Sequence, residues 1–160
     1  MTRRIVGIGS VCVEAGRAEL VAYAIGSCIA LCLYDRTACV GAMAHILLPA
    51  GNYTGHADSA TDLGTKYADH ALDAALRRMR DLGAHARDIE AGIVGGAMMF
   101  PHGGVRALHI GDMNVASVTQ ELHQHGIPLL FSVTGGEKSR TVTFRIPGDG
   151  LARQIEIRCH

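Results

Sequence analysis

Residues 26–49 read GSCIALCLYDRTACVGAMAHILLP, and this stretch decides the fold. Residues 29–34 form an apolar run of strand length, residues 35–38 have the composition of a turn, and residues 39–48 form a second apolar run. Two such runs joined by a short turn predict a β-hairpin. The other predicted elements flank this hairpin on both sides of the sequence.

Two helices are predicted after the hairpin. Residues 67–82 repeat apolar side chains at helical spacing, and Gly83 suits the position just after a helix. Residues 112–125 predict a second helix, with Asp112 as its N-cap. The order of elements predicts a layered α/β domain with a mixed β-sheet, hairpins and two main helices. Strands are predicted over residues 5–13, 19–24, 89–94, 128–133, 139–146 and 151–157, the last two forming a hairpin through residues 147–150.

Composition bounds the class of protein. The chain has 160 residues, which predicts a single domain over residues 1–160 that buries a core without metal or disulfide staples. Its 15 basic and 15 acidic residues balance, so charge gives no argument for nucleic acid or for an anionic membrane. The longest mostly apolar run, residues 22–34, is too short to span a bilayer, so no membrane insertion is expected.

The five cysteines indicate a compartment. They include no C-x-x-C pair, and the start of the chain has too few apolar residues for a signal peptide. Free thiols in a reducing cytoplasm are the simplest interpretation. Cys12, Cys32 and Cys39 are interpreted as core residues.

Cys28 and His45 are the candidate catalytic residues. Cys28 follows a Gly-Ser bend that leaves its backbone side open to approach, and His45 lies on the second strand of the hairpin. A thiol and an imidazole that can take its proton are the two parts of a cysteine nucleophile. Taken alone, each is more often a buried core residue, and only their contact in the fold distinguishes the two interpretations.

Other groups carry weaker signals. The nine histidines form no ligand pattern with cysteines or carboxylates, so zinc is a weak alternative. Gly95-Gly96 lacks the further residues of a phosphate-binding loop and predicts close backbone packing. Arg140, after Gly135-Gly136, is a candidate contact for a carboxylate or an acidic partner. The polar loop over residues 51–64 suggests a lid or a mobile rim.

Five motifs occur in order along the chain: GSCIALCLYD (26–35), GAMAHILLP (41–49), KYAD (66–69), GGAMMF (95–100) and IGxxN (110–114). Gly135-Gly136 followed by Arg140 continues the pattern. Together they resemble the CheD family, the chemoreceptor glutamine deamidases of bacterial and archaeal chemotaxis. The resemblance covers nearly the whole chain, and it implies a fold similar to that of the cytotoxic necrotising factor deamidase toxins.

The resemblance implies a hydrolase, a protein-glutamine glutaminase with a cysteine nucleophile and no metal or organic cofactor. Family members convert glutamines of methyl-accepting chemoreceptors to glutamates, some also act on receptor methyl esters, and many bind a CheC-type phosphatase. Cys28 matches the nucleophile and His45 the general base. Backbone N–H groups around Ser27 and Cys28 are the candidate oxyanion hole. The imidazole is expected to lower the pKa of the Cys28 thiol by forming an ion pair with the thiolate.

Two positions depart from the family pattern. Ala22 stands where the family usually has a threonine whose hydroxyl orients the histidine, and Met113 stands where arginine often precedes the asparagine of the last motif. Two hypotheses follow: an active thiol deamidase in chemotaxis signal transduction, or a non-catalytic adaptor that binds a CheC-type phosphatase or a receptor. Phe100, with Met98 and Met99, is the candidate partner surface, and core packing of this stretch is the alternative.

Overall fold

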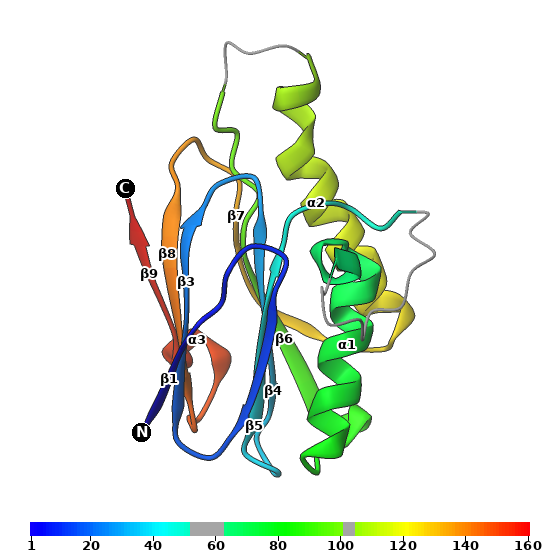
Figure 1. Cartoon of the computed structure of the whole chain (residues 1–160), viewed down its shortest axis with the longest axis vertical. Helices are drawn as coiled ribbons and strands as arrows, with labels where there is room; N and C mark the ends of the chain where they lie inside the picture. The colour runs from blue at the N-terminus through cyan, green and yellow to red at the C-terminus, as the bar shows by residue number, and fades with distance from the viewer. Residues whose placement is uncertain (52–62, 101–104) are drawn as a thin grey trace.

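The computed structural model describes residues 1–51, 63–100 and 105–160, and the chain folds into three layers (Figure 1). A four-stranded sheet, here called the outer sheet, packs against a five-stranded sheet, the central sheet. Helices α1 (Ala68–Asp81) and α2 (Val105–Gln124) cover the other face of the central sheet. The layered α/β architecture is confirmed, but the strands form two mixed sheets where one was predicted.

The outer sheet has the strand order β1-β3-β8-β9. Strand β1 runs parallel to β3, and the other neighbours are antiparallel. An irregularity interrupts the pairing of β3 with β8 between Ala22 and Ile25, where Ala24 adopts a φ of 55°. It lies just before the segment that carries Cys28. The strands are β1 (Thr2–Ile5), β3 (Ala18–Ile25), β8 (Arg140–Ile146) and β9 (Ile155–Cys159).

The central sheet has the strand order β2-β5-β4-β6-β7. Strands β6 and β7 are parallel, and the other neighbours are antiparallel. The predicted hairpin is confirmed as β4 and β5, which lie inside the sheet. The strands are β2 (Val11–Ala15), β4 (Ile29–Asp35), β5 (Val40–Ile46), β6 (Ile89–Gly95) and β7 (Leu129–Thr134).

Strands β4 and β5 are buried on both faces, and this explains their continuous apolar sequence. Leu31 and Leu33 point to the core under the helices, whereas Ala30 and Cys32 belong to the core between the two sheets. His45 is the cross-strand partner of Ala30. The imidazole therefore belongs to the layer between the sheets.

Helix α1 confirms the predicted helix over residues 67–82. Its buried face is mostly alanine, which lets the helix approach the central sheet closely. Short helical turns complete the described chain: η1 (Leu63–Lys66), η2 (Ala86–Asp88) and α3 (Leu151–Gln154). Among the described residues, no helix has the length and apolar character needed to cross a bilayer.

Two predicted elements at the start and end of the chain are wrong. The single strand over residues 5–13 is two strands in different sheets, because the chain turns through Gly9, which has a φ of 76°. The strand over residues 151–157 begins as helix α3, and only its second half continues as β9. Strands β8 and β9 still pair antiparallel, as the predicted hairpin required.

The second helix begins earlier than predicted. Helix α2 starts at Val105 and runs through Asp112, so Asp112 is not its N-cap. Gly111 lies inside the helix, where a Cβ would be 2.7 Å from the carbonyl oxygen of Gly96. Close packing, not chain reversal, accounts for this glycine. The predicted rim over residues 51–64 lies mostly outside the described residues.

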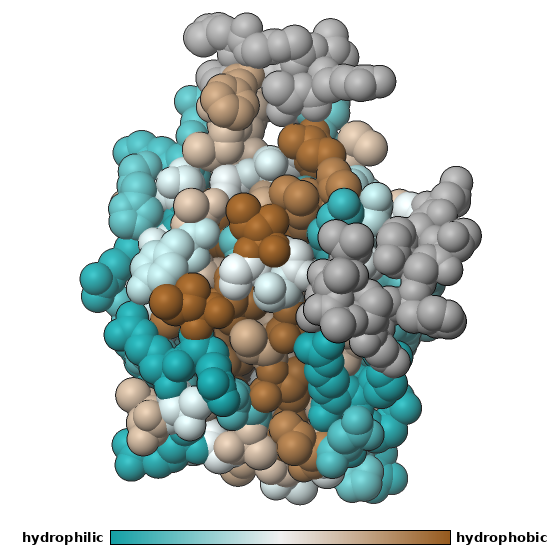
Figure 2. All heavy atoms as spheres, in the orientation of Figure 1, coloured by the Kyte–Doolittle hydropathy of each residue, from teal (hydrophilic) through white to brown (hydrophobic). Residues whose placement is uncertain are grey.

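Exposed apolar side chains gather on one face of the molecule. Figure 2 shows them in a band down the middle of the view, with hydrophilic side chains on either side. The residues with the most exposed apolar side chains lie largely near the chain start or near the ends of strands and helices: Met1, Ile5, Ile8, Tyr23, Leu82, Phe100, Met113 and Leu130.

Candidate active site

Cys28 lies in a short loop, here called the Cys28 loop (residues 26–28), between β3 and β4. Each of its three carbonyl groups accepts a hydrogen bond from another part of the chain. The N–H of Ala97 donates to the Gly26 oxygen at 2.8 Å, and the N–H of Gly96 donates to the Cys28 oxygen at 2.9 Å. The Asn114 side chain donates to the Ser27 oxygen at 2.9 Å.

The N–H groups of the Cys28 loop differ from its carbonyl groups in their hydrogen bonding. Within the described ranges, the backbone N–H groups of residues 26–28 donate no hydrogen bond to another residue. With the carbonyls tied back, the loop has backbone donors available for a ligand oxygen. Backbone N–H groups that can donate to a ligand oxygen are the kind of group from which an oxyanion hole is built.

Gly95-Gly96 lets the neighbouring chain approach the Cys28 loop closely. A Cβ on Gly95 would lie 2.1 Å from the Cys28 carbonyl oxygen, and a Cβ on Gly96 would lie 2.4 Å from a methyl carbon of Val115. Both glycines also have positive φ angles, 130° and 65°. The predicted role of this pair, close backbone packing, is confirmed.

His45 is held by the loop that joins β1 to β2. Its Nδ1 lies 3.1 Å from the carbonyl oxygen of Val6, its backbone N–H donates to Ser10, and its carbonyl accepts from Gly9. A carbonyl oxygen can only accept, so Nδ1 carries the proton and Nε2 presents a lone pair. Nε2 is buried and has no hydrogen-bond partner within the described part of the chain.

Register brings Cys28 and His45 toward each other. His45 pairs with Ala30 across β4 and β5, and Cys28 precedes Ala30 by two residues, so strand alternation places Cys28 on the same face and diagonal to His45. Diagonal neighbours are about 7–8 Å apart at their Cα atoms, within reach of long side chains. If Cys28 is the nucleophile and His45 the base, the thiol should donate a hydrogen bond to Nε2. That hydrogen bond is not formed in this structure.

Burial governs the protonation of both groups. Cys28 is 7% exposed and His45 is 2% exposed. Burial raises the pKa of the Cys28 thiol, and a hydrogen bond from its own backbone opposes this in part. Burial lowers the pKa of the His45 imidazole, and the hydrogen bond to Val6 opposes this in part. The resting pair is therefore a neutral thiol and a neutral imidazole, and the expected lowering of the Cys28 pKa is wrong.

Ala22 is fully buried between the two sheets and offers no hydroxyl. The group that orients His45 is instead the backbone carbonyl of Val6, which lies 39 residues away in sequence. No residue type signals such a contact, because every residue has a carbonyl. Sequence reasoning could notice the missing hydroxyl but not its replacement.

Among the described residues, Arg140 contacts backbone carbonyls and not the predicted carboxylate, whereas Phe100 is exposed, as a partner surface requires. Arg140 is 8% exposed and donates to the carbonyl oxygens of Gly95 and Gly135, so its guanidinium supports the backbone beside the Cys28 loop. Phe100 is 68% exposed, whereas the neighbouring Met99 packs against Gly26. The alternative of core packing is thus wrong for Phe100.

Asn114 is a residue of the site that sequence reasoning missed. It is fully buried, and the same Nδ2 donates to the Ser27 oxygen at 2.9 Å and to the Leu47 oxygen at 3.1 Å. The only signal was its place at the end of the IGxxN motif. Its contacts lie 87 and 67 residues away in sequence, out of reach of any local pattern.

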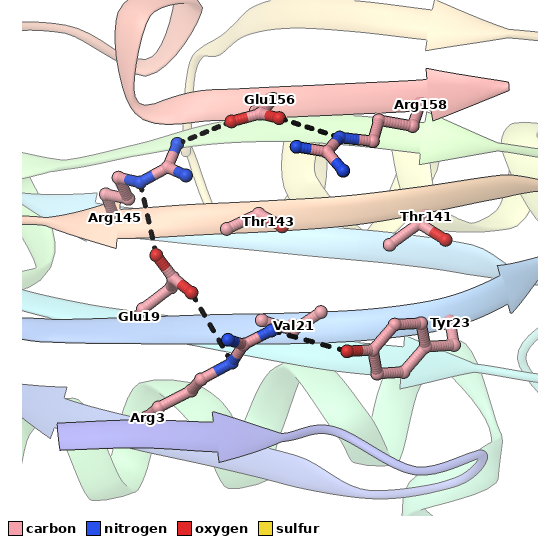
Figure 3. Close-up of a pocket in the computed structure, with 9 residues that line it drawn as sticks. All are labelled: Arg3, Glu19, Val21, Tyr23, Thr141, Thr143, Arg145, Glu156 and Arg158. Carbon is pink, nitrogen blue, oxygen red and sulfur yellow. Dashed lines mark hydrogen bonds and ion pairs between the residues drawn. The ribbon is translucent and has the colours of Figure 1, made fainter.

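A pocket of about 290 Å³ on the outer sheet is separate from these residues. Figure 3 shows its charged side chains in a ladder of ion pairs that runs from Arg3 through Glu19, Arg145 and Glu156 to Arg158. Arginine and glutamate side chains that neutralise one another are typical of a solvated sheet face. Across the described ranges, no group of three potential metal ligands is found.

Comparison with known proteins identifies the family. A family model described as CheD chemotactic sensory transduction matches residues 47–151. The chain is 37% identical to the chemoreceptor glutamine deamidase CheD of Thermotoga maritima over 96% of this chain and 92% of that protein. It is 39% identical to a probable chemoreceptor glutamine deamidase CheD of Pyrococcus abyssi over 89% of this chain and 85% of that protein. A probable chemoreceptor glutamine deamidase CheD of Desulfitobacterium hafniense, strain DCB-2, is 40% identical over 85% of this chain and 83% of its own length. The chain belongs to the CheD family.

Proposed function

We propose that this protein is a chemoreceptor glutamine deamidase, with Cys28 as nucleophile and His45 as general base. It hydrolyses the side-chain amide of receptor glutamines to glutamate and releases ammonia. One observation carries the proposal: among the described residues, the carbonyls of the Cys28 loop are hydrogen-bonded, its N–H groups donate to no other residue, and Nε2 of the diagonal His45 imidazole has no partner. The names of the relatives support the same substrate class.

The first step forms a thioester. The Cys28 Sγ attacks the side-chain carbonyl carbon of the glutamine while His45 Nε2 takes the thiol proton. The carbonyl oxygen becomes an oxyanion that the N–H groups of Ser27 and Cys28 stabilise, at about 3–4 kcal/mol for each donor. His45 then gives its proton to the leaving nitrogen, ammonia departs, and the acyl group remains on Cys28.

The second step consumes water. His45 takes a proton from a water molecule, and the resulting hydroxide attacks the thioester carbon. The intermediate collapses, the C–S bond breaks, and the thiol of Cys28 regains a proton from His45. A receptor methyl ester would follow the same route with methanol as the leaving group, so we include methylesterase activity in the proposal.

Because Cys28 and His45 are both neutral at rest, the thiol loses its proton during the attack and not before it. Since burial disfavours both the thiolate and the imidazolium, the proton leaves Sγ as the C–S bond forms. Hydrogen bonds between catalytic groups often tighten only when substrate binds, and this is compatible with a His45 Nε2 that has no partner among the described residues.

The same proposal includes the domain, its fold, the compartment and the signalling role. Residues 1–160 form one deamidase domain with a fold like that of the cytotoxic necrotising factor deamidases, and the protein acts in the cytoplasm in chemotaxis signal transduction. The balanced charge and the ion-pair ladder of the outer sheet support a protein substrate over nucleic acid.

Ammonia release from a receptor fragment tests the proposal. The wild-type protein should release ammonia and convert specific glutamines to glutamates, as read by peptide mass spectrometry. Cys28→Ala should reduce both to background, because no other group replaces the nucleophile. Cys159→Ala, which changes an exposed cysteine on β9, is the matched control and should retain full activity. Equal background release by wild type and Cys28→Ala would overturn the deamidase assignment.

A second candidate function is an adaptor that binds a CheC-type phosphatase. The observation that favours it is the 68% exposure of the Phe100 side chain, next to a methionine that packs on the Cys28 loop. Co-precipitation with a CheC-type protein should succeed with wild type and fail with Phe100→Ala. Leu130→Ala removes a similarly exposed side chain, 61%, from β7 and should leave binding intact. Failure of the wild-type protein to bind would end the adaptor assignment.

A further inference from the structure

Asn114 connects the two halves of the proposed catalytic pair. Its Nδ2 donates at 2.9 Å to Ser27, the residue before Cys28, and at 3.1 Å to Leu47, two residues after His45. Both bonds come from a single amide nitrogen. The Cys28 loop and the residue just after β5 are therefore hydrogen-bonded to the same side chain.

Helix α2 brings Asn114 to this position through Gly111, one turn earlier. A Cβ on Gly111 would lie 2.7 Å from the Gly96 oxygen and 2.8 Å from the Ala97 oxygen, so only glycine allows the helix to rest on this segment. The N–H groups of the same two residues bind the carbonyls of Cys28 and Gly26. The helix thus supports the Cys28 loop twice, through residues 96–97 and through the Asn114 side chain.

Packing alone does not explain an asparagine here. Asn114 is fully buried, yet its Oδ1 has no hydrogen-bond partner among the described residues. Buried polar atoms are ordinarily paired, and an unpaired acceptor is destabilising. A leucine has the same branching and no unpaired acceptor of its own, but it would leave the Ser27 and Leu47 carbonyls without this donor. The N–H donors are the part of this side chain that a leucine lacks.

We propose that Asn114 is a positioning residue that sets the spacing between Cys28 and His45 during deamidation. The inference rests on the proposed function. Without the shared donor, the Cys28 loop loses its bond at Ser27, and the end of β5 loses its bond at Leu47. Misplacement of a catalytic group by about 1 Å can cost about 100-fold in rate. The hydrogen bonds of Asn114 go to backbone carbonyls, so its effect acts through the backbone.

Asn114→Leu tests the proposal by separating stability from activity. It removes the donors and the unpaired Oδ1 with a larger side chain of the same branching, and it leaves the Ser27 and Leu47 carbonyls without this donor, so the thermal midpoint should fall modestly. At a temperature where the variant remains folded, kcat should fall by about 100-fold with KM unchanged. Asn114→Asp should lower kcat as well, because a carboxylate oxygen faces two carbonyl oxygens. Ser117→Ala, which removes the hydroxyl that accepts from the N–H of Ala50 one turn along α2, is the matched control and should keep the wild-type kcat.

A second readout does not require turnover. The rate of Cys28 alkylation by iodoacetamide, followed as a function of pH by peptide mass spectrometry, reports the environment of the thiol. In wild type the midpoint should lie above the ordinary thiol value of about 8.5, because the loop is held in a buried position. In Asn114→Leu it should fall toward that value as the loop is released to solvent.

The outcomes distinguish the two proposals. An inactive wild type whose alkylation midpoint still shifts in Asn114→Leu would reject deamidation and leave the positioning role standing. An active wild type with the same kcat and the same alkylation profile in Asn114→Leu would overturn the positioning role and leave deamidation standing. A kcat loss no larger than the loss of folded protein at the assay temperature, with an unchanged alkylation profile, would show a purely structural residue.

Discussion

His45 is oriented by a backbone carbonyl where relatives of this chain are expected to use a side-chain hydroxyl. The Val6 oxygen fixes Nδ1 as the protonated nitrogen and leaves Nε2 as the proton acceptor. Substitution of the Val6 side chain would leave its backbone carbonyl in place. The proposed base is thus held by the path of the β1–β2 loop, which two further backbone bonds fix at Gly9 and Ser10.

A hydroxyl at position 22 should therefore add no activity. Ala22 is fully buried between the sheets, so Ala22→Thr overpacks the core and should lower the free energy of unfolding by about 1–3 kcal/mol. Its kcat for ammonia release should stay at the wild-type level, because the Val6 carbonyl already selects the tautomer. Ala22→Val has the same shape without the hydroxyl and is the control. A tenfold higher kcat in the threonine variant than in the valine variant would show that His45 still needs a hydroxyl.

At the scale of elements, two backbone segments meet only because glycines remove side chains from the contact. Gly95 ends β6 against the Cys28 carbonyl, and Gly111 allows α2 to rest on residues 96–97. These contacts place the Cys28 loop by backbone alone. The IGxxN and GGAMMF motifs are thus two sides of one packing contact, and their order in the sequence does not reveal this.

Gly95→Ala should distort the Cys28 loop. The new Cβ would meet the Cys28 oxygen at 2.1 Å and would require a φ of 130°, so we expect a loss of about 3 kcal/mol or more in the free energy of unfolding. Gly126→Ala isolates the backbone cost, since Gly126 also has a positive φ, 68°, but its Cβ meets nothing within 4 Å. Urea denaturation should show a loss of only about 1 kcal/mol for this control. Equal losses in the two variants would mean that the steric contact with the loop is unimportant.

The elements that the sequence predicted well are those with local signals. The β4–β5 hairpin and helix α1 have their apolar pattern and their end signals within a few residues of one another. The split of residues 5–13 into two strands depends on Gly9, and the packing of α2 depends on Gly111, but a glycine has the same appearance in a turn and in a tight contact. Likewise Cys28 and His45 could be named from their motifs, whereas the contacts of Asn114 exist only once α2 has packed on the central sheet.

At the scale of the whole molecule, the charged groups of the outer sheet are separated from the buried imidazole of His45. The outer sheet presents its guanidinium and carboxylate groups to solvent in a continuous ladder (Figure 3), where solvent screens them. The layer between the sheets is apolar except for a few groups, and His45 is the only buried histidine among the described residues. The response of global stability to mild acid should therefore be sensitive to one buried imidazole.

Stability should fall as the pH is lowered through the range just below 6.5, the ordinary histidine value. Burial lowers the pKa of folded His45, so in this range the unfolded chain binds a proton that the folded chain does not. The slope is at most about 1.4 kcal/mol per pH unit for one proton, and the contribution is fully present above the unfolded pKa. His45→Gln keeps a donor for the Val6 carbonyl but does not titrate, so its urea midpoint should vary less between pH 7.5 and 5 than that of wild type. His123→Gln changes an exposed histidine near the end of α2 and should follow the wild-type curve. If His45→Gln follows the wild-type curve as well, the imidazole is not the buried group that senses acid.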